Sequence, residues 1–308
     1  MTTATIFPTS VFQSVFGVES SYGAGSGTPI GVLGVGMSID SIKQDMQLNP
    51  LYKLGSRTVQ RFYSQGWVVD LDTTFVLAAD QKLWLNLLLN KFGSTTTYYT
   101  VSSTYSTDLI PSGYCIIEDQ LGHFYNANGL MLDSVNFSFS QGKTCDVKGT
   151  FKGQLVNYST TSSTFPSPVV YPEEFTTWAT VDVSYNGTTD TFGVQPVTDL
   201  TIDIKNNMQP FYGLGSIDYK AFTATKLEVS GSVDILHDSG YLEKFLEPAS
   251  VITESTTYNL TLQIGSEYGT PYTITIEGMQ FNTGDMELKP VDPVVDKLTF
   301  VGRNIKIQ

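Results

Sequence analysis

The sequence PLYKLGS at positions 50–56 recurs as PFYGLGS at positions 210–216. Three more blocks repeat around it in the same order: 42–47 with 204–209, the apolar residues of 84–88 with those of 242–246, and 129–153 with 278–302. In the last block, five identical residues recur at one constant offset. One such match could arise by chance, but four in one order indicate an internal duplication. The chain is therefore expected to contain two domains of similar fold.

Apolar and polar residues alternate through both halves. Every second position is apolar in 135–139 and in 272–276, which is the period of a half-buried β-strand. Asn186-Gly187 stands between two further runs, 181–185 and 188–192, and this dipeptide tolerates the positive φ values of a tight hairpin turn. The pattern predicts a mainly β protein.

Helical periodicity occurs once in each half, over 80–92 and over 238–246. Asp80 and Asp238 stand at the first position of these runs and can cap a helix, and Pro248 stops the second run. The predicted fold is mainly β, with two tandem, structurally similar β-sandwich or barrel-like domains, each with one flanking α-helix.

A stretch rich in Ser, Thr and Pro begins at Asn157 and lacks alternation, as is typical of a linker. The sequence therefore predicts a first domain over 1–160 that includes an N-terminal arm, a linker over 161–174 and a second domain over 175–308. Of the 30 acidic residues 19 follow Pro166, together with 8 of the 17 basic residues. The acidity belongs almost entirely to the second domain.

The composition excludes several classes of protein. The net charge is −13, and basic residues are not clustered as a nucleic-acid-binding surface requires. With 41% hydrophobic residues the chain is too apolar to be disordered, yet no apolar run approaches the length of a membrane span. The N-terminus has no basic segment followed by an apolar stretch, so no secretion signal is expected.

A search for catalytic and ligand-binding residues finds little. The two cysteines, Cys115 and Cys145, are too few for a disulfide framework and are expected to be small buried residues, with a disulfide between them as the less favoured alternative. His123 and His237 lie in different domains without partners at metal-ligand spacing. Gly142-Lys143-Thr144 lacks the first glycine and the helix of a phosphate-binding loop. We expect no enzyme activity, no cofactor and no metal.

A duplicated β protein without such chemistry suggests a role in assembly. Two segments of apolar residues and tyrosine, 48–54 and 210–214, offer adhesive surface between strands. The same residues could instead fold back and anchor their own loops. The candidate residues for a subunit or ring-stacking interface are Met46, Leu51, Tyr52, Leu54, Arg57, Met208, Phe211, Tyr212 and Leu214.

Two motifs of the first half carry a resemblance to a known family. The segment GVESSYGA at 17–24 resembles the Glu-x-x-Tyr-Gly start of the tail tube proteins of tailed viruses, which are related to tail hub and baseplate domains. The segment YKLGSR at 52–57, followed by an alternating strand over 66–75 and then a helix, is similar as well. The second half departs from this pattern, because it has no arginine after Gly215-Ser216 and no glycine-rich arm.

The resemblance implies a β-sandwich or barrel-like domain with a helix, packed into rings that stack into a hollow tube. Two fused copies imply rings of three chains with pseudo-sixfold symmetry, although a hexamer is possible. The implied partners are further copies of the chain, the tape measure, terminator and baseplate proteins, and DNA in transient passage, with no membrane. The implied location is the virion tail, after synthesis in the host cytoplasm.

Two other functions stay open at this point. A tail hub, baseplate or tail-terminator ring would share the fold. A carbohydrate- or receptor-binding β module could use the 3 Trp and 17 Tyr residues for stacking on sugars. The loops 44–56 and 206–216 are the expected ring-stacking elements if the tube interpretation holds.

Overall fold

The strands of this protein follow one another along the chain without an intervening α-helix in the part that the structure describes. That structure is a computed structural model, which describes residues 13–52, 59–78, 84, 87, 111–119, 122–160, 175–186, 197–212, 219–236, 258–265, 272–287 and 295–307. Helical geometry within these residues is confined to the 3₁₀ helix η3 (Trp178–Thr180) and to positions 84 and 87.

Within the described residues, eight strands lie in the first half and nine in the second. The first-half strands are β1 (Gln13–Glu19), β2 (Gly27–Gly31), β3 (Val35–Tyr52), β4 (Val59–Val76), β5 (Gly113–Glu118), β6 (Phe124–Ser140), β7 (Asp146–Gly153) and β8 (Leu155–Ser159). The second-half strands are β9 (Val181–Asn186), β10 (Val197–Lys205), β11 (Met208–Tyr212), β12 (Tyr219–Ala224), β13 (Glu228–Leu236), β14 (Tyr258–Ile264), β15 (Tyr272–Glu287), β16 (Val295–Gly302) and β17 (Asn304–Ile307). The prediction of a mainly β protein is confirmed.

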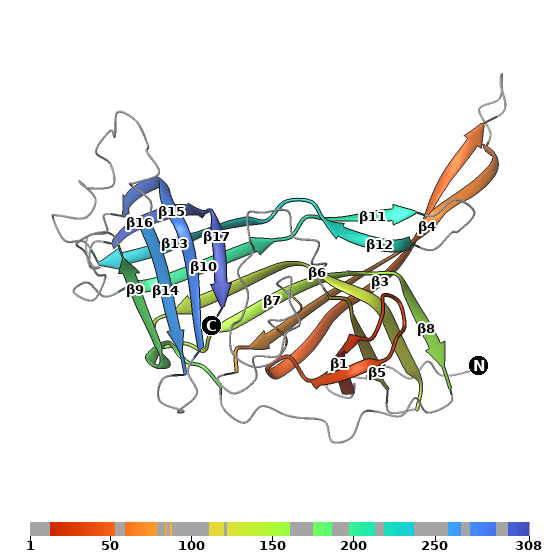
Figure 1. The fold of residues 1–308 in the computed structure, drawn as a ribbon, viewed down its shortest axis with the longest axis horizontal. Helices are drawn as coiled ribbons and strands as arrows, with labels where there is room; N and C mark the ends of the chain where they lie inside the picture. The colour runs from red at the N-terminus through yellow and green to blue at the C-terminus, as the bar shows by residue number, and fades with distance from the viewer. Residues whose placement is uncertain are drawn as a thin grey trace, which may run out of the picture.

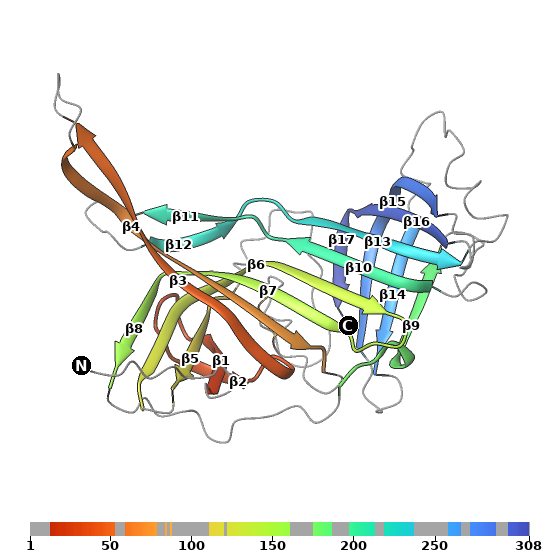
Figure 2. The ribbon, with the colours of Figure 1, turned by 180° about the vertical axis from the view of Figure 1, so that it is seen from behind.

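One antiparallel sheet runs through both halves. Its strand order is β3-β4-β7-β6-β10-β13-β16-β15, so the first four strands come from the first half and the last four from the second. We call it the common sheet. Figures 1 and 2 show it as the long central layer, with the outer part of the β3–β4 hairpin extending beyond the body of the molecule.

A second layer covers one face of the common sheet in each half. In the first half it contains β1, β2, β5, β8 and the start of β6, and in the second half β9, β14, β17 and the start of β15. The ring of Phe16 in β1 lies 5.5 Å from that of Phe151 in β7, so the two layers pack face to face. Each half is thus a β-sandwich joined to the other by the common sheet.

The two halves share their strand pairing as well as their topology. Leu132 of β6 faces Phe151 of β7, and Phe281 of β15 faces Phe300 of β16, 149 positions further along. The ladder bulges one position later in both copies. The remaining strands other than β2 also pair in matching order, so the two halves have similar folds.

Strand pairing also relates β3 and β4 to the second half. Lys43 faces Asp70, and 160 positions later Asp203 faces Ser230. The same offset relates the outer part of the β3–β4 hairpin to the β11–β12 hairpin, where Leu51 faces Arg61 and Phe211 faces Ala221. We define the counterpart of a residue as the one 160 positions away in these strands, or 149 positions away in β6, β7 and β8.

One block of the sequence repeat is corrected by this pairing. The match of 42–47 with 204–209 implies an offset of 162, but the ladder makes Ile202, opposite Gly231, the counterpart of Ile42, opposite Leu71. Side chains alternate with a period of two along a strand, so a slip of two residues preserves the inward and outward pattern. The hydrophobic pattern alone therefore could not detect the shift.

A glycine marks the point at which the longest strand of each half passes from the outer layer to the common sheet. Gly129 in β6 and Gly278 in β15 are counterparts and have positive φ values of 65° and 62°. Pairing with β8 ends at Asn128, and pairing with β7 begins at Met131. A positive φ at such a bulge is available to glycine at little steric cost.

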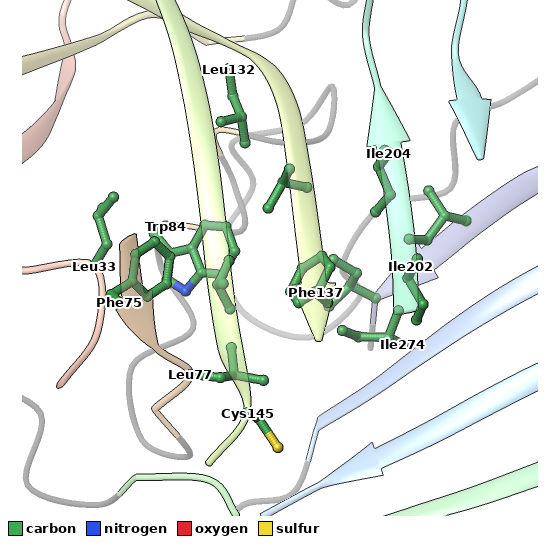
Figure 3. Close-up of a cluster of buried hydrophobic side chains, with 14 of the residues drawn as sticks. Leu33, Phe75, Leu77, Trp84, Leu132, Phe137, Cys145, Ile202, Ile204 and Ile274 are labelled. Carbon is green, nitrogen blue, oxygen red and sulfur yellow. The ribbon is translucent and has the colours of Figure 1, made fainter. Parts of the chain in front are cut away.

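The hydrophobic core is continuous between the halves. Figure 3 shows Phe137 of β6 on the same side of the paired strands as Ile202 and Ile204 of β10, and all three side chains are buried. Cys115 and Cys145 are free and buried, which confirms the prediction of buried thiols. Burial raises the pKa of both thiols, and the carboxylate of Asp146 contributes at Cys145, where the pKa reaches about 12.

The two expected helices lie outside the described residues, apart from two positions of the first. Trp84 and Leu87 are buried, and the Trp84 ring packs edge to face against Phe75 at 5.0 Å and lies 6.0 Å from the Phe137 ring. Because the described residues contain no α-helix, the flanking-helix part of the prediction is unsupported. The predicted turn at Asn186-Gly187 also lies at the limit of the described residues, since β9 ends there.

Candidate subunit interface

The joint between the two halves is an antiparallel strand pair. β6 and β10 pair over 134–140 and 199–205, with Ile202 facing Phe137 and Asp203 facing Asn136. On the core side the apolar residues are fully buried. On the opposite face Asn136 Nδ2 donates a hydrogen bond of 2.7 Å to Asp203 Oδ1. The joint thus combines backbone pairing, apolar burial and one polar contact.

A set of hydrogen bonds closes one end of this joint. Asp133 accepts at its carbonyl oxygen from Asn206 N at 2.7 Å and at Oδ1 from Met208 N at 2.7 Å. Asn206 Nδ2 donates to the carbonyl oxygen of Leu132 at 2.9 Å. These bonds satisfy polar groups where the second-half chain turns out of β10 and into β11.

The β11–β12 hairpin packs on the first half just beyond this end. Met208 and Phe222 are buried in a cluster with Met131 of β6, and Tyr22 and Val68 pack against the cluster. The rings of Tyr22 and Phe222 lie 6.4 Å apart. This hairpin is therefore part of the joint between the halves.

The Glu-x-x-Tyr-Gly motif has a structural role next to that hairpin. The buried Glu19 carboxylate accepts backbone N–H bonds from Gly23 and Gly25, both at 2.9 Å, and from Gly129 at 3.0 Å. Hydrogen bonds to a charged acceptor are stronger than neutral ones, so Glu19 fixes the loop that carries Tyr22. Burial, with a smaller effect of the Glu19 charge, raises the pKa of Tyr22 well above its usual value.

The predicted interface residues fall into four groups. Met46, Leu51 and Phe211 are exposed, whereas Met208 is buried in the joint between the halves and takes no part in an exposed surface. Tyr52 and Tyr212 end β3 and β11. Leu54, Arg57 and Leu214 lie outside the described residues. The assignment of these residues to ring stacking stays a prediction.

Several interface candidates were missed by sequence reasoning. Phe62 is 64% exposed, whereas its counterpart Phe222 is 2% exposed. Ile42 is 37% exposed, whereas its counterpart Ile202 is fully buried. Leu48, which the predicted adhesive segment 48–54 already included, is exposed as well, and its counterpart Met208 is buried. These differences become visible only when the strand register relates the two halves, because neighbouring residue types do not reveal them.

Apart from Val301 and the cluster around Met131, the uncovered face of the common sheet is polar. Asp70 and Lys152 face each other across β4 and β7 on this side. Lys152 Nζ lies 3.8 Å from Asp70 Oδ1 and 3.9 Å from Asp133 Oδ2. Asp72 accepts hydrogen bonds from Ser41 and Thr150 on the same side. This face therefore carries serine, threonine and acidic side chains with partial neutralisation by lysine.

Other kinds of site find no support in the same residues. Within the part of the chain that the structure describes, no three histidine, cysteine or acidic side chains gather as a metal site would require. None of the described helical segments has the length and apolar character needed to cross a membrane.

Comparison with known proteins places the chain in a family. No match was found among curated proteins. The sequence model of the family described as "Phage tail tube protein" matches residues 11–294, which is nearly the whole chain. The match spans both halves and the joint between them. The chain therefore belongs to the phage tail tube protein family.

Proposed function

We propose that three copies of this chain close a ring, that the rings stack into the hollow tail tube, and that DNA passes through its channel. Membership of the family makes the protein a structural component of the virion tail. Ring size, stacking and DNA passage go beyond that membership.

The ends of the common sheet are the observation that carries the proposal. Among the residues that the structure describes, the sheet ends in β3 on one side and in β15 on the other. Their counterparts are β10 and β6, which pair with each other inside the chain. The chain makes this pairing once, between β6 and β10, and carries a second copy of each partner, β15 and β3, at the two ends of the sheet. The same pairing can therefore be made between one chain and the next. Repetition closes the sheet into a barrel without exposed edges.

The polar face of the common sheet is the proposed channel lining. The opposite face is covered by the second layer of each half, so only the polar face is free to border a channel. Acidic side chains such as Asp70, Asp72 and Asp203 lie on it. Fixed negative charge repels DNA phosphates over about one Debye length, roughly 8–10 Å at physiological salt, which favours passage over binding.

The hairpin ends are the proposed stacking elements. Leu51 is 50% exposed and its counterpart Phe211 is 55% exposed, so neither copy of this position is covered by the joint between the halves. An apolar position left exposed in both copies fits a contact from ring to ring. This supports a stacking role for the outer ends of the segments 44–56 and 206–216, around Leu51 and Phe211.

The units of this assembly are the two sandwiches. We propose the division into 1–160 and 175–308 with a linker over 161–174, and further contacts with tape measure, terminator and baseplate proteins at the ends of the tube. We also propose that the protein works without catalysis, cofactor or metal.

Electron microscopy of the purified full-length chain tests the proposal. We expect hollow tubes whose rings contain three chains, measured by negative-stain imaging together with the mass of rings released at low protein concentration. Single rings that never stack would indicate a terminator or hub ring instead. A chain that stays monomeric at high concentration would overturn the proposal.

A further inference from the structure

We infer that the free edge of β3 binds the free stretch of β15 from a second copy of this chain, in one defined register that places Lys43 opposite Asp285. The inference rests on the proposed ring and adds the residues that meet across its joint. It comes from treating the β6–β10 joint inside the chain as a template for the joint between chains.

The two edges are unpaired along the stretches that matter. Within the described residues, β3 pairs only with β4, and positions 283–287 of β15 pair only with β16. The counterparts of these stretches pair with each other inside the chain. Backbone N–H and C=O groups at an open edge are a template for another strand. One chain therefore carries both components of the joint, at opposite ends of the common sheet (Figures 1 and 2).

The internal register transfers directly to the joint between chains. Inside the chain, Lys205 faces Ser134 and Thr201 faces Ser138, with three pairs between them. Replacing each residue by its counterpart gives the register between chains. The pairs are Asp45 with Thr283, Gln44 with Gly284, Lys43 with Asp285, Ile42 with Met286 and Ser41 with Glu287.

The apolar pair of this register accounts for an exposed isoleucine. Ile42 is partly exposed, whereas Ile202, its counterpart, is fully buried opposite Phe137. The inferred register puts a methionine opposite Ile42, so an apolar residue meets an apolar residue in both joints. Binding of the second chain would remove the Ile42 side chain from water.

The polar pair matches in charge. Asp203 and Asn136 are hydrogen-bonded across the internal joint, and their counterparts are a lysine and an aspartate at positions 43 and 285. Lys43 Nζ lies 3.4 Å from Asp45 of its own strand, and both side chains are more than half exposed. A second carboxylate can therefore approach Lys43, and opposite charges that face each other across strands stabilise the pairing.

The hairpin beyond β3 continues the joint. Phe222 of the internal joint packs on Met131, which faces Lys152. In the second half the corresponding pair is Gln280 and Val301, and Val301 is an exposed apolar residue. In the first half the apolar residue of this pair is Met131 in β6, and in the second half it is Val301 in β16. Phe62, the counterpart of Phe222, would find its apolar contact there.

One hydrogen bond of the internal joint has no copy between chains. Asn206 Nδ2 donates to the carbonyl oxygen of Leu132, and the counterpart of Asn206 is Met46, which has no side-chain donor. The joint between chains therefore depends on strand pairing, the Lys43–Asp285 pair and apolar contacts of Ile42 and Phe62.

Disulfide trapping in assembled full-length protein tests the register. The variant Lys43→Cys with Asp285→Cys places two cysteines directly opposite, where Cα atoms lie about 4.5–5.5 Å apart, within disulfide range. The matched control Lys43→Cys with Glu287→Cys moves one cysteine by two residues, to a diagonal neighbour about 7–8 Å away. The native cysteines are buried with raised pKa values, so they contribute little thiolate to the exchange.

We expect the opposite pair to form at least about tenfold more crosslinked chains than the diagonal pair on non-reducing gels, with covalent species that end at three chains. Equal crosslinking of the two pairs, or none in tubes that micrographs show to be intact, would overturn the register and leave the ring proposal standing. Absence of rings and tubes in the unmodified protein would instead overturn the ring proposal.

Charge reversal covers the case in which the cysteine variants do not assemble. Lys43→Glu and Asp285→Lys are each expected to reduce ring formation, and the double variant is expected to restore it. Restoration identifies direct coupling between the two positions. A double variant as defective as the singles would contradict the inferred pair.

Discussion

Phe62 and Phe222 occupy the same position in the two copies and differ in what covers them. Phe222 packs on Met131 within the chain, and Phe62 extends from the β3–β4 hairpin with most of its ring exposed. When a residue is buried in one copy and exposed in the other, the single chain supplies its covering contact only once. The same reasoning applies to Ile202 and Ile42.

The two phenylalanines are expected to respond differently to substitution. Phe222→Ser should lower the free energy of unfolding of the dispersed chain by about 3–5 kcal/mol, because it opens a cavity in a packed cluster. Phe62→Ser should change it by no more than about 0.5 kcal/mol, since the ring is exposed, and should still prevent ring formation. Urea unfolding and electron microscopy measure the two effects. Normal rings from Phe62→Ser would remove this residue from the interface.

At the scale of single elements, the long strands β6 and β15 belong to both layers of their sandwich. Each strand changes layer at a glycine with positive φ, and the backbone bonds around that glycine repeat as well. Gln154 N donates to the carbonyl oxygen of Asn128 at 2.9 Å, and the counterparts Arg303 and Glu277 form the same bond at 2.9 Å. The duplication thus preserves the bend that holds the two layers together.

Substitution at that bend should be costly. A Cβ at Gly278 would lie 2.8 Å from Arg303 Cβ, and the positive φ itself costs an L-residue about 1–2 kcal/mol. Gly278→Ala is therefore expected to lower the free energy of unfolding by more than that amount. Gly142→Ala is the control, because Gly142 also has positive φ but open space around it. Thermal unfolding of both variants measures the contribution of the contact, and equal losses would contradict it.

Much of this could be predicted from the sequence, and the rest depends on register. Alternation over 135–139 and 272–276 predicted strands that the structure confirms, with inward residues buried. The repeat predicted two similar halves. The β6–β10 joint could not be predicted, because local patterning does not specify which strands meet across the halves. The sequence match of 42–47 with 204–209 is shifted by two residues from the strand pairing. This shift could not be predicted either, since a slip of two residues leaves every side chain on the same face.

The candidate interface was predicted only in part. Runs of apolar residues and tyrosine indicated Leu51 and Phe211, which the structure leaves exposed. The same runs indicated Met208, which packs inside the chain. Phe62 belongs to no such run, and its exposure follows from the absence of a partner that its counterpart has. Such a surface consists of residues whose counterparts are covered by a neighbouring strand. It can be recognised only when the arrangement of the whole chain is known.

For the molecule as a whole, the common sheet consists of two copies of one four-strand unit. The β6–β10 pairing joins the two copies within the chain, and the corresponding pairing of β15 with β3 is not made within the chain. The single chain thus has a direction, because β3 ends one side of the sheet and β15 the other. Contacts of this kind between unlike surfaces close sideways into rings, and a second set of contacts is required along the axis for a tube to form. Comparison of the two copies separates the two sets. In the proposed assembly, we assign positions that differ in exposure to the joint within a ring, and apolar positions exposed in both copies to contacts between rings.

That separation predicts a variant with rings and no tubes. Leu51→Ser combined with Phe211→Ser removes an apolar side chain that is exposed in both copies, so the fold and the ring joint should be retained while stacking weakens. We expect isolated rings in negative-stain images and an unfolding free energy within about 0.5 kcal/mol per substitution of the unmodified chain. Val301→Ser, which alters the proposed ring joint instead, is the control and should reduce rings and tubes together. Tubes of normal length from the double variant would show that rings stack through other residues, and loss of both rings and tubes would place Leu51 and Phe211 in the joint within the ring.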